Sequence, residues 1–138
     1  MIFLTRETID STALLAAVQD RLCGAVVLFL GTVRELTGAL RTVYLEYDAY
    51  GPMAEKKLGE VASLARDRWP IRRVAIVHRL GKLAVGETAV AVAVSAPHRA
   101  EAFAAAAFIM DTVKELVPIW KRENAPDGSS EWVHEGKS

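Results

Sequence analysis

The sequence lacks the features that mark several special classes of protein. Its 138 residues contain one cysteine, Cys23, which excludes an intramolecular disulfide and argues against a cysteine-based metal site. Lys and Arg together number 17, as do Asp and Glu, so the chain has no basic excess to drive non-specific binding to nucleic acids or membranes. No apolar run reaches the ~18 residues of a membrane span.

Motifs for several common chemistries are also missing. The chain has no HExxH, P-loop or GxGxxG motif and no paired-carboxylate signature, so metal-dependent hydrolysis and nucleotide binding have no support. The N-terminal stretch MIFLTRETID has no basic region followed by a long apolar run, so we expect no signal peptide. We expect a soluble cytoplasmic protein that holds neither a metal nor a resident cofactor.

What the chain does contain is enough apolar sequence for one domain. Hydrophobic residues make up 51% of it, which predicts a single domain over residues 1–138, with a frayed tail after about residue 135. Strand pairs separated by helices predict an α+β fold: a mixed, mostly antiparallel sheet with three main helices packed on one face. The predicted strands are 2–5, 25–33, 42–48, 71–80, 87–95, 119–122 and 131–134, the predicted helices are 12–22, 53–69 and 97–116, and a loop (34–41) and a turn (81–86) connect them.

The segment 95–123 combines an apolar helical body with cationic groups at both ends. His98 and Arg99 fall in the first helical turn, where free backbone N–H groups and the helix dipole favour an anion. An imidazole and a guanidinium there would add a phosphate or carboxylate site. The alternative is a surface histidine and an arginine that pairs with Glu101. A cation is unfavourable at a helix N-terminus, which tilts the interpretation toward binding.

Two lysines flank the break at Pro118. Lys114 could simply stabilise the helix C-terminus and pair with Asp111, and Lys121 could lie along Trp120. Because the chain reverses between them, the two lysines could instead converge on one pocket and supply a nucleophile or a base.

Three further positions carry weaker signals. Arg34 ends a predicted buried strand, where either a site or an ordinary surface arginine fits. His78 ends another strand and favours a structural role. Cys23 precedes Gly24 in an apolar setting that is typical of a packed core thiol.

Taken in order, these motifs resemble the large, catalytic subunit of molybdopterin synthase over nearly the whole chain. The series HR…K…PxWKxE is the most specific part of the resemblance. The matching motifs are GTVR (31–34), LEY (45–47) with Met53-Ala54, Arg68-Trp69, HRLG (78–81), SxxHR (95–99) with Ala102-Phe103, DxxK (111–114) and PIWKRE (118–123) with Asp127-Gly128 and Trp132.

The resemblance implies a cytoplasmic sulfurtransferase of molybdenum cofactor biosynthesis with an α/β hammerhead-like fold. Its substrate would be cyclic pyranopterin monophosphate. Sulfur would come from the C-terminal Gly-Gly thiocarboxylate of a small ubiquitin-like partner, and two sulfurs would form the dithiolene of molybdopterin. Family members form a homodimer of the large subunit with one small subunit at each end, a heterotetramer.

The resemblance also implies roles for individual residues. Lys114 and Lys121 match the family's catalytic lysines and contact substrate. Arg34, His98 and Arg99 match its substrate-anion ligands. Beside these ligands lie Thr32, Val33, Arg122 and Glu123. The chain departs from the family soon after Trp132, where some members carry a longer, partly basic tail.

These residue types suit that chemistry. A phosphate-bearing substrate needs cationic ligands, and an ammonium group can pair with a thiocarboxylate and steady developing negative charge. A neutral lysine could also trap the acyl group as an amide. Cys23 has no activating cluster around it in the sequence, and in the resembled family the sulfur arrives on the partner, so we do not assign it a sulfur-carrying role.

Helix length adds one geometric prediction. Arg99 and Lys114 are 15 positions apart, which corresponds to ~22 Å of rise on an unbroken α-helix. One small substrate cannot touch both residues. We therefore predict a composite site, in which Lys114, Lys121 and Arg34 come from one subunit and His98 and Arg99 come from its dimer mate.

Two other functions compete with this one. The chain could be a non-catalytic, anion-binding regulatory dimer that uses His98 and Arg99, although such a module needs no converging lysines. It could also be a scaffold that only docks a ubiquitin-like partner, which would not need the phosphate cluster.

Overall fold

The computed structural model describes residues 1–37 and 40–134, which fold into three helices and ten strands. Secondary structure follows the chain in this order: β1 (Ile2–Thr5), α1 (Ser11–Val18), β2 (Ala25–Thr32), β3 (Leu36–Thr37), β4 (Leu40–Arg41), β5 (Tyr44–Ala49), α2 (Gly51–Arg68), β6 (Arg73–Arg79), β7 (Gly81–Ala84), β8 (Thr88–Ala96), α3 (Arg99–Leu116), β9 (Ile119–Asn124) and β10 (Ser130–His134). The predicted frayed tail after residue 135 lies outside the described residues.

The strands form two four-stranded sheets and one short pair. The first sheet has the order β1-β6-β8-β2, and only its β1–β6 pair is parallel. The second has the order β10-β9-β5-β7 and is antiparallel throughout, while β3 and β4 pair with each other. The α+β class with mostly antiparallel pairing is therefore confirmed, although we expected one sheet.

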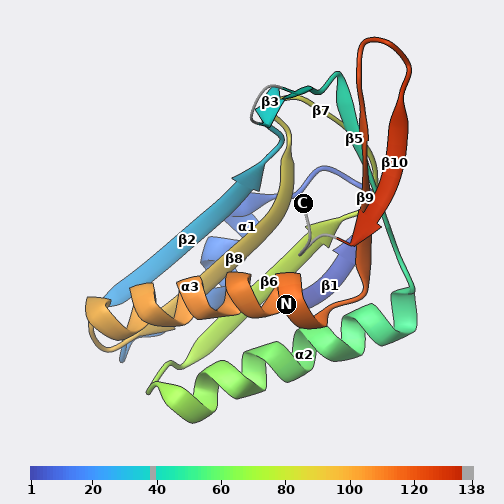
Figure 1. Cartoon of the computed structure of the whole chain (residues 1–138). Coiled ribbons are helices and arrows are strands. Elements are labelled where there is room, and N and C mark those ends of the chain that lie inside the picture. Colours follow the sequence, from blue (N-terminus) through green and yellow to red (C-terminus); the bar gives the residue numbers. More distant parts are fainter. Residues whose placement is uncertain (38–39, 135–138) are drawn as a thin grey trace.

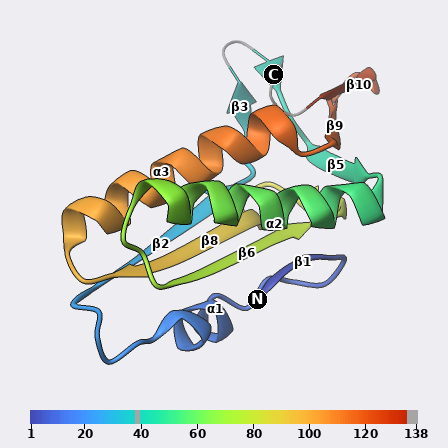
Figure 2. The same cartoon turned by 90° about the horizontal axis from the view of Figure 1, so that it is seen from below.

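Helices cover both faces of the first sheet, so the prediction of helices on one face is wrong. α2 and α3 lie side by side on one face and α1 lies on the other, as Figures 1 and 2 show. The cause is the alternation in β8, whose residues from Ala89 to Ala96 are all buried. Its valines, such as Val92, pack in the core with α2 and α3, whereas Ala91 and Ala93 make room for α1. A strand that is apolar on both faces needs a cover on each.

Several element boundaries differ from the predicted ones. α1 ends at Val18 rather than residue 22, and its N-cap is Asp10, whose side chain accepts a hydrogen bond from the Ala13 N–H. The predicted turn 81–86 contains β7, which pairs with β5. The predicted loop 34–41 contains β3 and β4 within its described residues. No helix in the described part of the chain is long and apolar enough to cross a membrane.

Candidate functional site

A cavity of about 330 Å³ lies where the end of β2, the last turns of α3 and strand β9 meet. Four charged side chains line it: Arg34, Lys114, Lys121 and Glu123. Arg34 follows β2, whereas Lys114 on α3 and Lys121 and Glu123 on β9 come from consecutive elements some 80 positions further along the chain. Apolar walls are supplied by residues of β2, β5, β8 and α3, namely Phe29, Leu30, Leu45, Tyr47, Ala89, Val90 and Met110.

The two lysines meet because the chain reverses at Pro118. α3 ends at Leu116, and the capping residue Val117 adopts an extended conformation with φ −88° and ψ 127°. Proline disfavours a helical conformation in the residue before it, which suits this break. β9 then runs back along β5, as Figure 1 shows. Lys114 stays exposed on the last turn of α3, while Lys121 is only 12% exposed.

Strand alternation decides which residues of β9 face the cavity. Lys121 pairs in register with Tyr47 and Glu123 pairs with Leu45, so these four side chains share one face. The Lys121 ammonium lies 3.7 Å from the Glu123 carboxylate. The carboxylate therefore partly neutralises this lysine inside the pocket.

Arg122 points to the other face of β9. Its guanidinium donates a 2.7 Å hydrogen bond to the Glu46 carboxylate and lies over the Trp132 ring, 4.7 Å from the ring centroid. These contacts hold β5, β9 and β10 together. The structure does not bring the Arg122 side chain to the cavity.

The end of β2 brings Thr32 and Arg34 to the cavity but turns Val33 away from it. The register with β8 shifts between Gly31 and Thr32. The Val33 N–H then donates to the Glu87 carbonyl oxygen, and the Val33 side chain is 3% exposed in the core. Thr32 and Arg34, the residues before and after Val33 in the sequence, line the cavity.

His98 and Arg99 lie at the opposite end of α3. Both are exposed, and neither lines the cavity. His98 caps the helix through its backbone without a side-chain capping bond. α3 is unbroken from Arg99 to Leu116, so the ~22 Å separation that follows from helix rise holds in the structure.

The alternative roles for single residues have mixed outcomes. Lys114 and Asp111 are both exposed, and the described ion pairs include no contact between them. His78 is fully buried, as a structural role requires, and its ring packs edge-on against Tyr47 at 4.9 Å between centroids. Cys23 is only half-buried and lines an open cavity, so the prediction of a packed core thiol is wrong.

Sequence reasoning missed the apolar half of the site. Tyr47 and Met110 line the cavity, and Tyr47 connects it to the buried His78. The available signal was the alternation of Leu45 and Tyr47, which puts both on one face of β5. That face could not be assigned to the site until the partner strand β9 was known.

Comparisons with known proteins agree over most of the chain. The family model described as MoaE protein matches residues 4–116. A curated molybdopterin synthase catalytic subunit from Halalkalibacterium halodurans is 51% identical over 110 residues, covering 80% of this chain and 70% of the relative. The crystal structure of molybdopterin synthase from Staphylococcus aureus superposes with a TM-score of 0.91 at 42% identity, covering 96% of both chains.

A more distant structure shares the fold alone. It is a protein-protein complex of subunits 1 and 2 of the molybdopterin-converting factor from Helicobacter pylori. The match has a TM-score of 0.74 at 20% identity and covers 96% of this chain and 88% of that chain.

Proposed function

Since the chain belongs to the MoaE protein family, we propose that Lys114 and Lys121 perform the chemistry of a molybdopterin synthase catalytic subunit in the cavity they share with Arg34. The chain is an enzyme of molybdenum cofactor biosynthesis, because relatives at about half identity carry that function. The observation that supports the site is the convergence of two lysines from α3 and β9 on one cavity.

The reaction we propose is sulfur transfer from a small ubiquitin-like partner. The thiocarboxylate at the partner's C-terminal Gly-Gly donates sulfur to cyclic pyranopterin monophosphate, and two transfers give the dithiolene of molybdopterin. The two-subunit complex from Helicobacter pylori supports a small-subunit partner. We propose a cytoplasmic location for this reaction.

The lysines occupy different environments, which suggests different roles. Lys121 is nearly buried beside Glu123 and is held in place, so it suits the stabilisation of negative charge that develops on the acyl group. Lys114 is exposed at the rim and can reach an incoming peptide tail. Arg34, at the end of β2, provides a guanidinium for an anionic group of the substrate.

The size of the cavity supports a site completed by a second subunit. Its 330 Å³ is at the lower end of the range of about 300–1,000 Å³ that is usual for small-molecule sites. A pterin phosphate and a peptide tail together need further walls and further cations. His98 and Arg99 are suitable cations, but within one chain they lie a whole helix away.

A dimer formed at the β2 edge would bring His98 and Arg99 of one copy to the cavity of the other. Among the described strands β2 pairs with β8 alone, and Val26, Phe29 and Leu30 on it are exposed, as is Phe103 on α3. β2 and α3 run in roughly the same direction (Figure 1), and the hydrogen bond from the Gly24 N–H to the Pro97 carbonyl oxygen joins their starts.

A two-fold axis at this edge would set the two β2 strands antiparallel. The start of α3 in one copy would then approach the end of β2 in the other. This homodimer, with one small subunit at each end, is the heterotetramer we propose. The β2 edge offers an exposed apolar strand for it, which is otherwise a liability in a soluble sheet.

A reconstituted reaction tests the lysine roles. The purified chain is mixed with the thiocarboxylated small subunit and the cyclic pterin precursor, and dithiolene product is measured. We expect Lys114→Ala and Lys121→Ala each to lower turnover by ~10²–10⁴-fold, while Lys56→Ala on the surface of α2 leaves it unchanged. Unchanged turnover in Lys114→Ala would exclude that lysine from the chemistry. A complete lack of product with the unsubstituted chain would favour a regulatory anion-binding dimer.

Mixing two inactive variants tests the composite site. In a dimer of Lys114→Ala with Arg99→Ala, one of the two pockets keeps both native residues if each pocket draws on both chains. After random exchange of subunits, activity should return to about one quarter of the native value. Activity that stays at the level of the separate variants would show that each pocket is built within one chain.

A further inference from the structure

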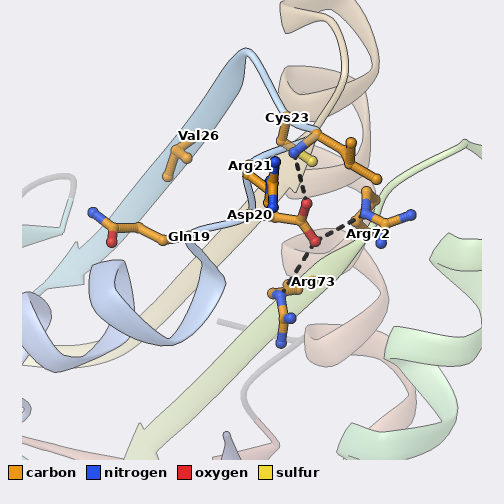
Figure 3. Close-up of a pocket in the computed structure, with 8 residues that line it drawn as sticks. Gln19, Asp20, Arg21, Cys23, Val26, Arg72 and Arg73 are labelled. Carbon is orange, nitrogen blue, oxygen red and sulfur yellow. Dashed lines mark hydrogen bonds and ion pairs between the residues drawn. The ribbon is translucent and has the colours of Figure 1, made fainter.

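A second, larger cavity lies at the other end of the first sheet. It has a volume of about 920 Å³ and is bounded by the loop after α1 and the start of β6. Its charged lining consists of Asp20, Arg21, Arg72 and Arg73, and these residues are shown with the interactions between them in Figure 3. Three guanidinium groups and one carboxylate give the lining a net charge of +2 at neutral pH.

Asp20 holds two of these arginines side by side. Its Oδ2 accepts hydrogen bonds from Arg72 Nε at 2.8 Å and Arg73 Nε at 3.4 Å, and its Oδ1 accepts one from the Leu22 N–H at 2.9 Å. The side chain of Asp20 is only 5% exposed. The hydrogen bond from Arg72 is the main cause that lowers the pKa of Asp20 below its ordinary value, so the carboxylate stays charged.

The way in which Arg72 and Arg73 bind Asp20 leaves much of each guanidinium available. Each contacts the carboxylate through Nε, and in Figure 3 the terminal amino groups point away from it. The two side chains are 47% and 58% exposed. A guanidinium whose terminal nitrogens are open can donate two parallel hydrogen bonds to a phosphate or carboxylate.

Backbone hydrogen bonds tie this cluster to the start of α3. The Arg72 N–H donates to the Ser95 carbonyl oxygen at 2.9 Å, and the Gly24 N–H donates to the Pro97 carbonyl oxygen at 3.3 Å. A Cβ on Gly24 would lie 3.1 Å from that oxygen, which explains the small residue at this close approach. The arginine pair is thus fixed next to the turn that carries His98.

We propose that Arg72 and Arg73, aligned by Asp20 and accompanied by Arg21, form a binding site for a phosphate-class oxyanion. The site lies at the opposite end of β2 from the Lys114–Lys121 cavity. The ligand can be the phosphate ester of the substrate or free inorganic phosphate, because both present the same tetrahedral oxygens. Only the substrate alternative rests on the proposed function and its dimer.

Inorganic phosphate is the probe for the site itself. Phosphate binding to the full chain is measured by calorimetry or by ³¹P NMR, without the small subunit or any turnover. We expect saturable binding that Arg73→Gln weakens by about tenfold and that Arg66→Gln, an exposed arginine of α2 outside the cavity, leaves unchanged. No binding to the native chain, or equal binding by both variants, would overturn the proposal.

A second variant tests the alignment by Asp20. Asp20→Asn raises the net charge of the lining by one, so simple charge attraction would strengthen phosphate binding. If alignment matters more, as we propose, binding weakens because the two guanidiniums lose their shared anchor. Tighter binding by Asp20→Asn would overturn the aligning role. Thermal unfolding of each variant shows whether the fold is retained.

The source of the phosphate group is decided by kinetics in the reconstituted reaction. If the site holds the substrate's phosphate, Arg73→Gln raises KM for the cyclic pterin by about tenfold with little change in kcat. If it holds free phosphate, KM is unchanged while phosphate binding is still lost. A raised KM and an unchanged KM with weakened phosphate binding both support the oxyanion site. The turnover of Lys114→Ala tests the proposed function separately, because Lys114 lies outside this cavity.

Discussion

Gly31→Ala should destabilise the protein because the added methyl group has no space. Gly31 lies in β2 opposite Val90 of β8, at the point where the register shifts. A Cβ built on Gly31 would lie 2.7 Å from Val90 Cγ1 and 3.4 Å from Phe29 Cε1. Carbon atoms pack best at about 3.5–4.0 Å, so the first contact is too short by about 1 Å.

Val90 cannot easily move aside. It is 3% exposed in the core, and a β-branched side chain has few accessible rotamers. Overpacking of this kind costs about 1–3 kcal/mol in the free energy of unfolding. For 138 residues the unfolding entropy is about 0.3 kcal/mol/K, so the melting temperature should fall by about 3–10 °C. Chemical denaturation followed by circular dichroism measures the change, with the slope m unchanged.

Two controls separate this clash from a general effect of replacing glycine. Gly59→Ala places a methyl group on α2 where no atom lies within 4 Å, so it should stabilise the protein by up to about 1 kcal/mol. Val90→Ala alone should cost about 2 kcal/mol, but in the Gly31→Ala background it removes the clashing Cγ1. The double variant should therefore be about as stable as either single variant. Full additivity, or a native-like Gly31→Ala, would refute the reasoning.

Three further perturbations test other parts of the structure. The folded-state pKa of Asp20 is lowered, so Asp20 stabilises the protein above its unfolded pKa of about 3.8. This stabilisation is lost as the pH falls through the lower folded-state pKa. The difference in the free energy of unfolding between the native chain and Asp20→Asn should therefore shrink on acidification, which denaturation at a series of pH values measures. Ile109→Ala empties a fully buried position in α3 and should cost about 2–5 kcal/mol by urea denaturation; a loss under 1 kcal/mol would mean that the core is loosely packed there. Glu46→Gln keeps the size of the side chain but removes the charge that pairs with Arg122, and it should lower the free energy of unfolding by up to about 1 kcal/mol. In the Arg122→Gln background the same change should have no effect, which a double-mutant cycle measures.

Helices and strands were predicted correctly where the residues of a single stretch carry the pattern of that element. The strand at 87–95 was visible from alternating apolar residues, and α3 ends at Leu116, where the predicted helix ends. The elements that were missed, β3, β4 and β7, are two to four residues long and are strands only because of their partners. Pattern recognition needs a longer run than these provide.

The candidate site divides in the same way. Lys114, Lys121 and Arg34 could be singled out from the sequence because helix ends, a proline break and a strand end place charged groups at edges, but their assignment to a site came from the resemblance to a known family. The sequence could not predict that Val33 faces the core or that Arg122 faces Glu46, because each orientation depends on a register set by another strand. The one-residue alternation of a strand makes that register decisive.

The sequence by itself determined the apolar pattern of the main helices and strands, the break at Pro118 and the length of α3. These follow from local conformational preferences and from the constant rise of a helix, so the separation of Arg99 and Lys114 needed no tertiary information. Only the tertiary structure decided which face of β6 and β8 each helix covers and which side chains meet in a cavity. Asp20 and Arg72 are 52 positions apart, and their contact exists because the sheet brings the loop after α1 to the start of β6. Contacts of that kind depend on how distant segments pack, which no local pattern encodes.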